Sequence, residues 1–222
     1  MIPQEEVDRF IAERNPLYAE NLRLRAEIAK LHRQLEQLKA GEKRASAIRS
    51  PLIWFGGKSR LAPEIIRRMP PHKVYVEPFG GAAHVLVQKP RAQHEIYNDI
   101  DGNLVNFLMV ARAQPERLKE ACESLPYSRE LYERWKREPW PEDEFERAIR
   151  FFYLNRSAIS GGNASRSTGW SHGTKQNKNK ATSYLRACEL IPALAQRMRG
   201  VMIDRNDFRE IIRTYDGPDT LF

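Results

Sequence analysis

The stretch from Val74 to Asp101, VYVEPFGGAAHVLVQKPRAQHEIYNDID, decides the fold. It begins as a short apolar strand, Val74–Val76, and breaks into a turn of small residues, Gly80–Ala83. We expect a helix after this turn and then a second strand, Glu95–Asn98, which ends at the acid Asp99. This order of strand, glycine turn, helix, strand and carboxylate predicts a nucleotide-binding crossover in an α/β domain.

The turn and the acid together favour a ligand that contains adenosine. Glycines let the backbone approach a ligand closely, and an acid at the end of the second strand can accept both ribose hydroxyls. The spacing G-x-G-x-x-G is absent and no Gly-Lys-Ser/Thr follows the strand, which disfavours a dinucleotide or a triphosphate. An adenosine cofactor without phosphates fits best. A tight turn in an ordinary α/β domain is the simpler alternative, and these residues alone leave it open.

Composition points to one domain with an appendage and to a polyanionic partner. The chain has 222 residues, a formal net charge of +8 and a pI near 9.6, which favours nucleic acid. Cys122 and Cys188 lack the spacing of metal ligands, so we predict no metal site and expect a reducing compartment. The N-terminal residues are charged and no stretch is apolar enough to cross a membrane, so a cytoplasmic location is expected.

Residues 1–45 predict a helical extension with the pattern of a coiled coil. Asn15 and Pro16 form a helix start, with the asparagine as cap and the proline at the first helical position. A heptad seam follows in steps of four and three: Leu17, Asn21, Leu24, Ile28, Leu31, Leu35 and Leu38. Asn21 at an a position favours a parallel dimer in one register, so residues 16–40 predict a homodimer. The alternative is an amphipathic helix that lies on its own domain.

A second glycine loop, Trp54-Phe55-Gly56-Gly57-Lys58, precedes the deciding stretch. Trp54 can cover a planar or cationic part of a ligand, and Lys58 can reach a carboxylate. Alternatively, Trp54 is an ordinary buried tryptophan and Lys58 is a solvated surface residue. The short sequence distance to the turn at Gly80–Ala83 adds weight to the ligand-binding interpretation.

The elements expected after Asp101 are a core helix, further charged helices and two strands. They occupy residues 104–110, 115–150, 184–199, 201–203 and 209–215, and a last strand begins at Thr220. Pro192 predicts a kink or a break in the helix of residues 184–199.

Residues 161–180, GGNASRSTGWSHGTKQNKNK, form the loosest and most basic part of the chain. Cationic and amide side chains with one aromatic residue suit contacts to phosphates and base edges. The alternative is an ordinary surface loop. His172 has no partner at metal-ligand spacing, so it predicts no metal site.

Five motifs in this order give the sequence a resemblance to a known family. They are Trp54–Lys58, Glu77–Ala83, Asp99–Asp101, Phe151–Arg156 (FFYLNR) and Asp207–Phe208. From about Pro51 to Phe222 the sequence resembles the Dam-like (D12-class) DNA adenine-N6 methyltransferases. The resemblance implies an α/β, Rossmann-like fold that binds S-adenosylmethionine, here with an incomplete sheet, a helical DNA-recognition insertion and the N-terminal coiled-coil extension.

The resemblance also implies how the chain is divided. Residues 46–111 and 186–222 would form the cofactor-binding core of the methyltransferase. Residues 112–185 would form the DNA-recognition region, with duplex DNA as partner. The residues expected to contact DNA are polar, basic or aromatic: Asn155, Arg156, Arg166, Trp170, Lys175 and Lys178.

For the cofactor, the resemblance implies a role for each matched motif. Trp54 and Lys58 would hold the methionine end of S-adenosylmethionine. Asp99 would bind the ribose, and Asp207 with Phe208 would bind the adenine. Three residues of the central motif complete the expected cofactor-binding set: Glu77, Phe79 and Gly81.

Two departures from the family pattern bear on activity. Ala83 stands where a glycine is usual, and the catalytic tetrapeptide Asp-Pro-Pro-Tyr is absent from the 222 residues, so no catalytic residue is assigned. We therefore expect a site-specific DNA adenine-N6 methyltransferase that is inactive as this chain alone. Either a second polypeptide that carries the tetrapeptide completes it, or the chain is a truncated product. The alternative is a non-catalytic DNA-binding or assembly module built on a truncated methyltransferase.

Overall fold

The computed structural model divides the chain into two units, Met1–Ala45 and Ser46–Phe222. It describes residues 20–21, 23–25, 27–33, 48–161, 169–173 and 179–222. In the first unit the described residues are helical and exposed, and Leu24, Ile28 and Leu31 are each at least half exposed. Leu17, Leu35 and Leu38 of the predicted seam lie outside the described residues, and the coiled coil stays a prediction.

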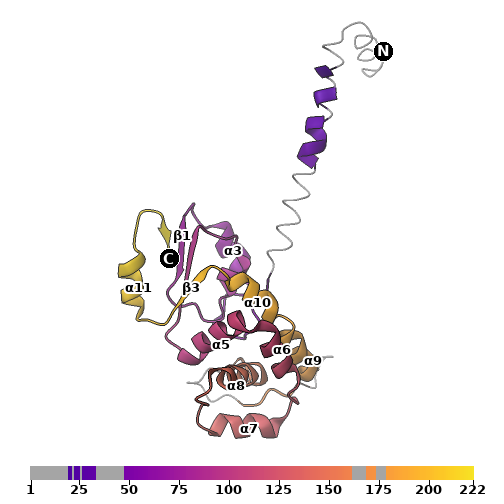
Figure 1. Cartoon of the computed structure of the whole chain (residues 1–222), viewed down its shortest axis with the longest axis vertical. Helices are drawn as coiled ribbons and strands as arrows, with labels where there is room; N and C mark the ends of the chain where they lie inside the picture. The colour runs from indigo at the N-terminus through magenta and orange to yellow at the C-terminus, as the bar shows by residue number, and fades with distance from the viewer. Residues whose placement is uncertain (1–19, 22, 26, 34–47, 162–168, 174–178) are drawn as a thin grey trace. The chain divides into compact units, whose positions relative to one another are not determined.

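Four parallel strands form the sheet of the second unit (Figure 1). They are β1 (Val74–Glu77), β2 (His94–Asn98), β3 (Val201–Asp204) and β4 (Thr220–Leu221), in the spatial order β3-β2-β1-β4. Val74 pairs with both His94 and Thr220, so β1 lies inside the sheet. The predicted α/β class and strands are confirmed. The order reverses between β1 and β4, and ligands of such sheets bind where the strand order reverses, at the carboxyl ends.

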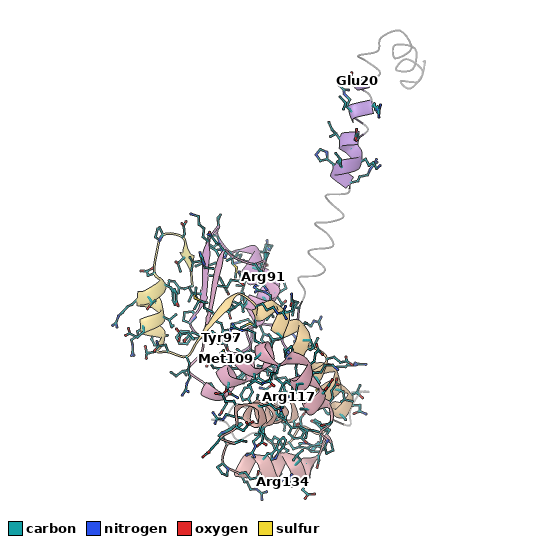
Figure 2. All side chains as sticks on the ribbon, viewed as in Figure 1. Glu20, Arg91, Tyr97, Met109, Arg117 and Arg134 are labelled. Atoms are coloured by element: carbon teal, nitrogen blue, oxygen red, sulfur yellow. The ribbon has the colours of Figure 1, made fainter. Side chains whose placement is uncertain are left out.

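The two faces of the sheet are buried by different helices, because strand residues alternate in direction. Tyr75 and Tyr97 join the larger core, together with α4 (His84–Gln88), α5 (Gly102–Ala113) and α10 (Ile191–Met198). Figure 2 labels Tyr97 among the side chains of this unit. On the other face, Val76 and Ile96 pack against Ile211 of α11 (Phe208–Tyr215).

Four further helices extend the larger core away from the sheet (Figure 1): α6 (Pro115–Glu123), α7 (Arg129–Arg137), α8 (Glu144–Ser157) and α9 (Lys180–Cys188). The short helix α3 (Ala62–Arg67) lies beside the sheet and contacts α4. Phe107 of α5 stacks on Phe152 of α8 with ring centroids 5.5 Å apart, so the helical region shares its core with the sheet. Asp143 caps the N-terminus of α8, because its carboxylate accepts from the Glu146 amide at 2.8 Å.

The region expected as one helix over residues 184–199 consists of two helices, α9 and α10. Pro192 lies in the first turn of α10, where the missing amide hydrogen of proline costs no intrahelical bond. The predicted break at Pro192 is therefore confirmed.

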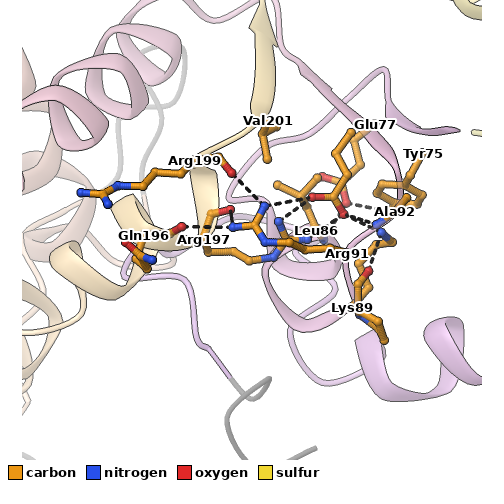
Figure 3. Close-up of polar contacts among 12 residues, drawn as sticks. Tyr75, Glu77, Leu86, Lys89, Arg91, Ala92, Gln196, Arg197, Arg199 and Val201 are labelled. Atoms are coloured by element: carbon orange, nitrogen blue, oxygen red, sulfur yellow. Dashed lines mark hydrogen bonds and ion pairs between the residues drawn. The ribbon is translucent and has the colours of Figure 1, made fainter. Parts of the chain in front are cut away.

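A buried ion cluster joins β2 to α10 at the amino end of the strands (Figure 3). Glu95 is 2 % exposed and accepts from Lys89 Nζ at 2.7 Å and from Arg197 at 2.6 and 2.8 Å. Burial alone would raise the pKa of Glu95, but the hydrogen bonds from Arg197 and Lys89 outweigh it and lower this pKa. The cluster fixes α10 on the sheet as a paired, water-excluded contact.

Candidate cofactor-binding site

The turn after β1 rests on the ring of Tyr97. A Cβ atom built on Gly80 would lie 2.1 Å from this ring, so only glycine fits there. The Tyr97 hydroxyl donates to the Gly81 carbonyl at 2.5 Å, and burial raises the pKa of Tyr97 so that it stays a donor. Gly81 itself has φ +49°, in the left-handed region that glycine adopts readily.

The second glycine loop meets this turn. A Cβ atom on Gly81 would lie 2.7 Å from Trp54 Nε1, and one on Gly57 would lie 2.7 Å from the ring of His84. Each loop therefore uses a glycine to admit an aromatic side chain that faces it from the other loop. Burial lowers the pKa of His84, which favours a neutral imidazole at this contact. The sequence analysis predicted the two loops but not their contact.

Asp99 is fixed beside the turn at the carboxyl end of β2. Its Oδ2 accepts from the Gly81 amide at 2.8 Å and its Oδ1 accepts from the Asp101 amide at 2.9 Å. Asp101 in turn caps α5 by accepting from the Asn103 amide at 3.0 Å. Each oxygen of Asp99 keeps a further lone pair, so this carboxylate can still accept hydrogen bonds from a ligand.

Glu77 closes the inner side of the turn. Its Oε1 accepts from the Tyr75 hydroxyl and from the Leu86 amide, both at 2.8 Å. Burial raises the pKa of Glu77 to about 7, more than these two donors lower it. Glu77 therefore carries a proton for part of the time near neutral pH.

Two phenylalanines form the outer side of the site. The rings of Phe79 and Phe208 have centroids 5.0 Å apart, and Phe79 is 73 % exposed. Asp207 precedes Phe208 and caps α11 by accepting from the Arg209 amide at 2.8 Å. The buried side chain of Asn98 links the two loops that carry the rings, because it donates to the Pro78 and Asn206 carbonyls at 2.9 and 3.0 Å.

These groups surround a cavity of about 260 Å³ between the two glycine loops. Trp54, Lys58, Glu77, Phe79 and Gly81 line it, as does His84, and Asp99 and Phe208 contact residues of the lining. Glycines without a Cβ, a fixed carboxylate and an open aromatic pair fit an adenosine compound with a polar chain. The predicted cofactor residues therefore meet in one place.

Comparison with known proteins adds the chemical class. The family model for the D12 class N6 adenine-specific DNA methyltransferases matches residues 54–222. The chain belongs to this family. Its match to the DNA adenine methylase of Escherichia coli (strain K12) is 31% identical over 118 residues, 51% of this chain and 42% of the relative. The DNA adenine methylase of Haemophilus influenzae is 30% identical over 117 residues, 50% of this chain and 41% of the relative. The matches thus cover less than half the length of these relatives.

The DNA residues expected from the D12-class motif FFYLNR lie inside the helical region. Asn155 is 1 % exposed, and both ends of its amide bind the backbone of Ile53, at 2.9 and 2.8 Å. Arg156 donates to the Ser183 carbonyl at 3.2 Å, and burial lowers its pKa. A direct DNA contact by Asn155 does not fit this placement, because its donor and acceptor are used within the chain.

Trp170 lies at the base of the basic loop and remains partly exposed. Its ring is 5.5 Å from that of Tyr127, whose hydroxyl donates to the Ser171 carbonyl at 2.7 Å. The exposed guanidinium of Arg129 lies 4.9 Å over the Trp170 ring, a basic neighbour that the sequence analysis missed. The other predicted DNA residues, Arg166, Lys175 and Lys178, lie outside the described residues.

Three supporting residues of the D12-class site were also missed: Tyr97, Asn98 and His84. Tyr97 and Asn98 were predicted only as parts of a strand, and His84 was given no role. Each one holds a loop of the cavity through a contact between segments distant in sequence, so no local pattern marks it.

Within the described residues, no three His, Cys, Asp or Glu side chains gather in a way that could hold a metal ion. Across the same part of the chain, no helix has both the length and the apolar character needed to span a bilayer.

Proposed function

We propose that this chain binds S-adenosylmethionine in the cavity between the two glycine loops, as part of a site-specific DNA adenine-N6 methyltransferase. The observation that carries the proposal is the interlocking of the loops, in which Trp54 lies against Gly81 and His84 against Gly57. The two loops come from the two motifs that predicted a cofactor. Family membership supplies the reaction class, and the site supplies the residues.

Each lining residue has a role that its position supports. Lys58 is exposed at the cavity and its ammonium group can pair with a carboxylate, and the indole of Trp54 can cover the chain that carries this carboxylate. Asp99 accepts ribose hydroxyls with its remaining lone pairs. Phe79 and Phe208 offer ring faces to an adenine. The bound cofactor supplies an electrophilic methyl group.

The acceptor is the N6 amino group of adenine in duplex DNA. An enzyme that modifies a base must take this base out of the stack. The net charge of +8 favours the phosphate backbone, and Trp170 with Arg129 provides an aromatic and cationic surface at the base of the basic loop. Asp-Pro-Pro-Tyr, which would hold the target amino group, does not occur in the 222 residues. We assign methyl transfer to the assembly of this chain with a polypeptide segment that carries such a tetrapeptide.

Calorimetric titration with S-adenosylmethionine tests the cofactor site. We expect the wild-type chain to bind, and Trp54→Ala and Asp99→Ala each to weaken binding by about tenfold or more. Asp219→Ala is the matched control, because Asp219 pairs with Lys73 at the amino end of the strands, away from the cavity. Circular dichroism melts confirm that each variant is folded.

A folded wild-type chain without measurable binding would overturn the proposal and favour a non-catalytic module.

Incubation with labelled S-adenosylmethionine and an adenine-containing duplex tests whether methyl transfer needs a further polypeptide segment. We expect no incorporation by this chain alone, and label transferred by the isolated chain would contradict the need for a further segment.

We also propose that residues 16–40 associate two chains in parallel. The described seam residues Leu24, Ile28 and Leu31 are exposed at 50%, 52% and 57%, which leaves an apolar stripe for a second copy. Glu20 and Arg25 occupy g and e positions, where opposite charges pair between parallel helices. Sedimentation equilibrium should give a dimer, and Ile28→Glu a monomer. The control Arg33→Glu changes a residue outside the seam and should remain dimeric. A wild-type chain that sediments as a monomer would refute the dimer.

A further inference from the structure

The second glycine loop, Trp54–Lys58, is called the cofactor loop below. One amide side chain of the helical region holds the residue that precedes this loop. Asn155 lies on α8, yet both of its hydrogen bonds go to Ile53, the residue before Trp54. The Ile53 amide donates to Asn155 Oδ1 at 2.9 Å, and Asn155 Nδ2 donates to the Ile53 carbonyl at 2.8 Å. Two bonds to one residue fix its orientation as well as its distance, as a neighbouring strand would.

Gly161, in the segment that follows α8, also contacts Ile53. Gly161 has φ +65°, and a Cβ atom there would lie 2.4 Å from the Ile53 carbonyl oxygen and 2.5 Å from its side chain. Ile53 is therefore held between Asn155 and the Gly161 backbone. By contrast, the bond from the Gly57 amide to the Trp54 carbonyl, at 3.0 Å, lies within the loop and cannot fix the loop against the turn.

The segment that follows α8 also carries the base of the basic loop. The Ser171 amide donates to the Ser157 carbonyl at 2.7 Å, and the Ile159 amide donates to the Gly169 carbonyl at 2.9 Å. The end of α8 thus contacts the Trp170 segment on one side and the cofactor loop on the other. This arrangement joins the two parts of the site through α8.

We propose that Asn155 is a positioning residue, which holds the cofactor loop so that Trp54 lies over the cavity. The inference rests on the proposed function in one respect, the identity of the cofactor. Asn155 does not line the cavity and acts only through Ile53. A loop displaced by a fraction of an ångström no longer presents its side chains in a productive position.

The experiment compares Asn155→Ala with Tyr153→Phe. Tyr153 is the matched control, because it is also buried on α8 and its hydroxyl binds the backbone of Pro126 and Ser128, away from the cofactor loop. Calorimetry with S-adenosylmethionine should show affinity reduced by about tenfold in Asn155→Ala and by no more than about twofold in Tyr153→Phe. Hydrogen exchange of residues 52–58 should accelerate only in Asn155→Ala.

Asn155→Asp provides a rescue. A protonated carboxyl group has one donor and one acceptor, like the amide, whereas the carboxylate would face the Ile53 carbonyl as a second acceptor. Its affinity relative to wild type at the same pH should therefore recover as the pH falls from 8 to 5.5. A residue that only stabilised α8 would not give this profile.

Equal affinity and equal loop exchange in Asn155→Ala and Tyr153→Phe would overturn the inference. If the wild-type chain binds no S-adenosylmethionine but exchange of residues 52–58 still accelerates only in Asn155→Ala, the positioning role stands and the proposed cofactor is wrong.

Discussion

The two ends of the sheet each carry a glutamate, and the two glutamates differ in how their charge is compensated. At the amino end, Glu95 is surrounded by Lys89 and Arg197, and these hydrogen bonds lower its pKa in spite of burial. At the carboxyl end, Glu77 accepts hydrogen bonds from a hydroxyl and an amide, without a hydrogen bond from a cation. Burial raises its pKa to about 7, more than these bonds and the charges of Lys89 and Arg197 lower it. The charge of Glu95 is thus neutralised by hydrogen-bonded cations, whereas the charge of Glu77 is compensated less completely.

This difference fits a structural role for the amino end and the proposed ligand-binding role for the carboxyl end. Charged groups that pair with one another inside the protein cannot also bind a ligand. At the carboxyl end, the Glu77 carboxyl group has a raised pKa, the Phe79 ring is exposed, and Asp99 has lone pairs free to accept hydrogen bonds, so these groups can bind one. The carboxyl end is also where parallel sheets bind ligands. Perturbing both ends in matched ways tests whether this separation is real.

The largest expected effect comes from adding one methyl group to the turn. In Gly80→Ala the Cβ atom meets the Tyr97 ring at 2.1 Å, which a buried ring cannot avoid. We expect the free energy of unfolding to fall by about 3 kcal/mol and S-adenosylmethionine binding to be lost. Denaturant titration and calorimetry measure the two effects.

Gly217→Ala is the equivalent change in the turn before β4, at the amino end. Its Cβ atom would lie 3.6 Å from Thr220 Oγ1, an ordinary contact. Cofactor affinity should stay within about twofold of wild type, because the substitution is far from the cavity. Equal loss of binding in both variants would show that the cavity is sensitive to stability in general.

The sequence alone predicted the carboxyl end of the sheet well. A turn of small residues after a strand and an acid at the end of the next strand are local patterns, and these patterns marked Gly80, Gly81 and Asp99. The positions of the strands along the chain and the break at Pro192 follow from local patterns of apolar residues and proline. Five of the predicted cofactor residues line one cavity: Trp54, Lys58, Glu77, Phe79 and Gly81. Asp99 accepts from the Gly81 amide and Phe208 packs on Phe79, whereas Asp207 caps α11.

The helical region was harder to read, for a physical reason. Successive residues of α8 point in directions about 100° apart, and a motif does not say which direction faces solvent. Asn155 was expected to touch DNA, but it lies on the buried side and binds Ile53. Arg129 was missed because it reaches Trp170 only once α7 has packed. Contacts between distant segments decide both cases.

A change of intermediate size distinguishes the two glutamates by pH. The pKa of Glu77, raised from 4.5 to about 7, means that the folded state holds the proton more tightly than the unfolded state. The stability of the wild type must therefore decrease as the pH rises from about 4.5 to 7 through this group. Glu77→Gln keeps an acceptor for Tyr75 and Leu86 and cannot ionise. Its free energy of unfolding relative to that of the wild type should therefore increase by about 2 kcal/mol as the pH rises from about 5 to 8.

Glu95→Gln should give the opposite sign. The lowered pKa of Glu95 contributes stability above its unfolded pKa, and this stability is lost as the pH falls through the folded pKa. The variant should thus have a lower free energy of unfolding than the wild type at neutral pH, and this difference should decrease toward pH 3. Denaturant midpoints across this range measure both variants. Parallel pH profiles for the two glutamates would refute the distinction between the ends.

The smallest effect is expected at Ala83, where the family usually has glycine. Ala83 has φ +54° and ψ +31° and is fully buried, so Ala83→Gly relieves about 1 kcal/mol of left-handed strain. It also removes a buried methyl group that contributes about 0.8 kcal/mol. The two nearly cancel, and we expect denaturant stability within about 0.5 kcal/mol of wild type and unchanged affinity for S-adenosylmethionine. A tenfold gain in affinity would instead mean that the alanine distorts the turn, and that the carboxyl end is adapted less closely to its cofactor than its geometry indicates.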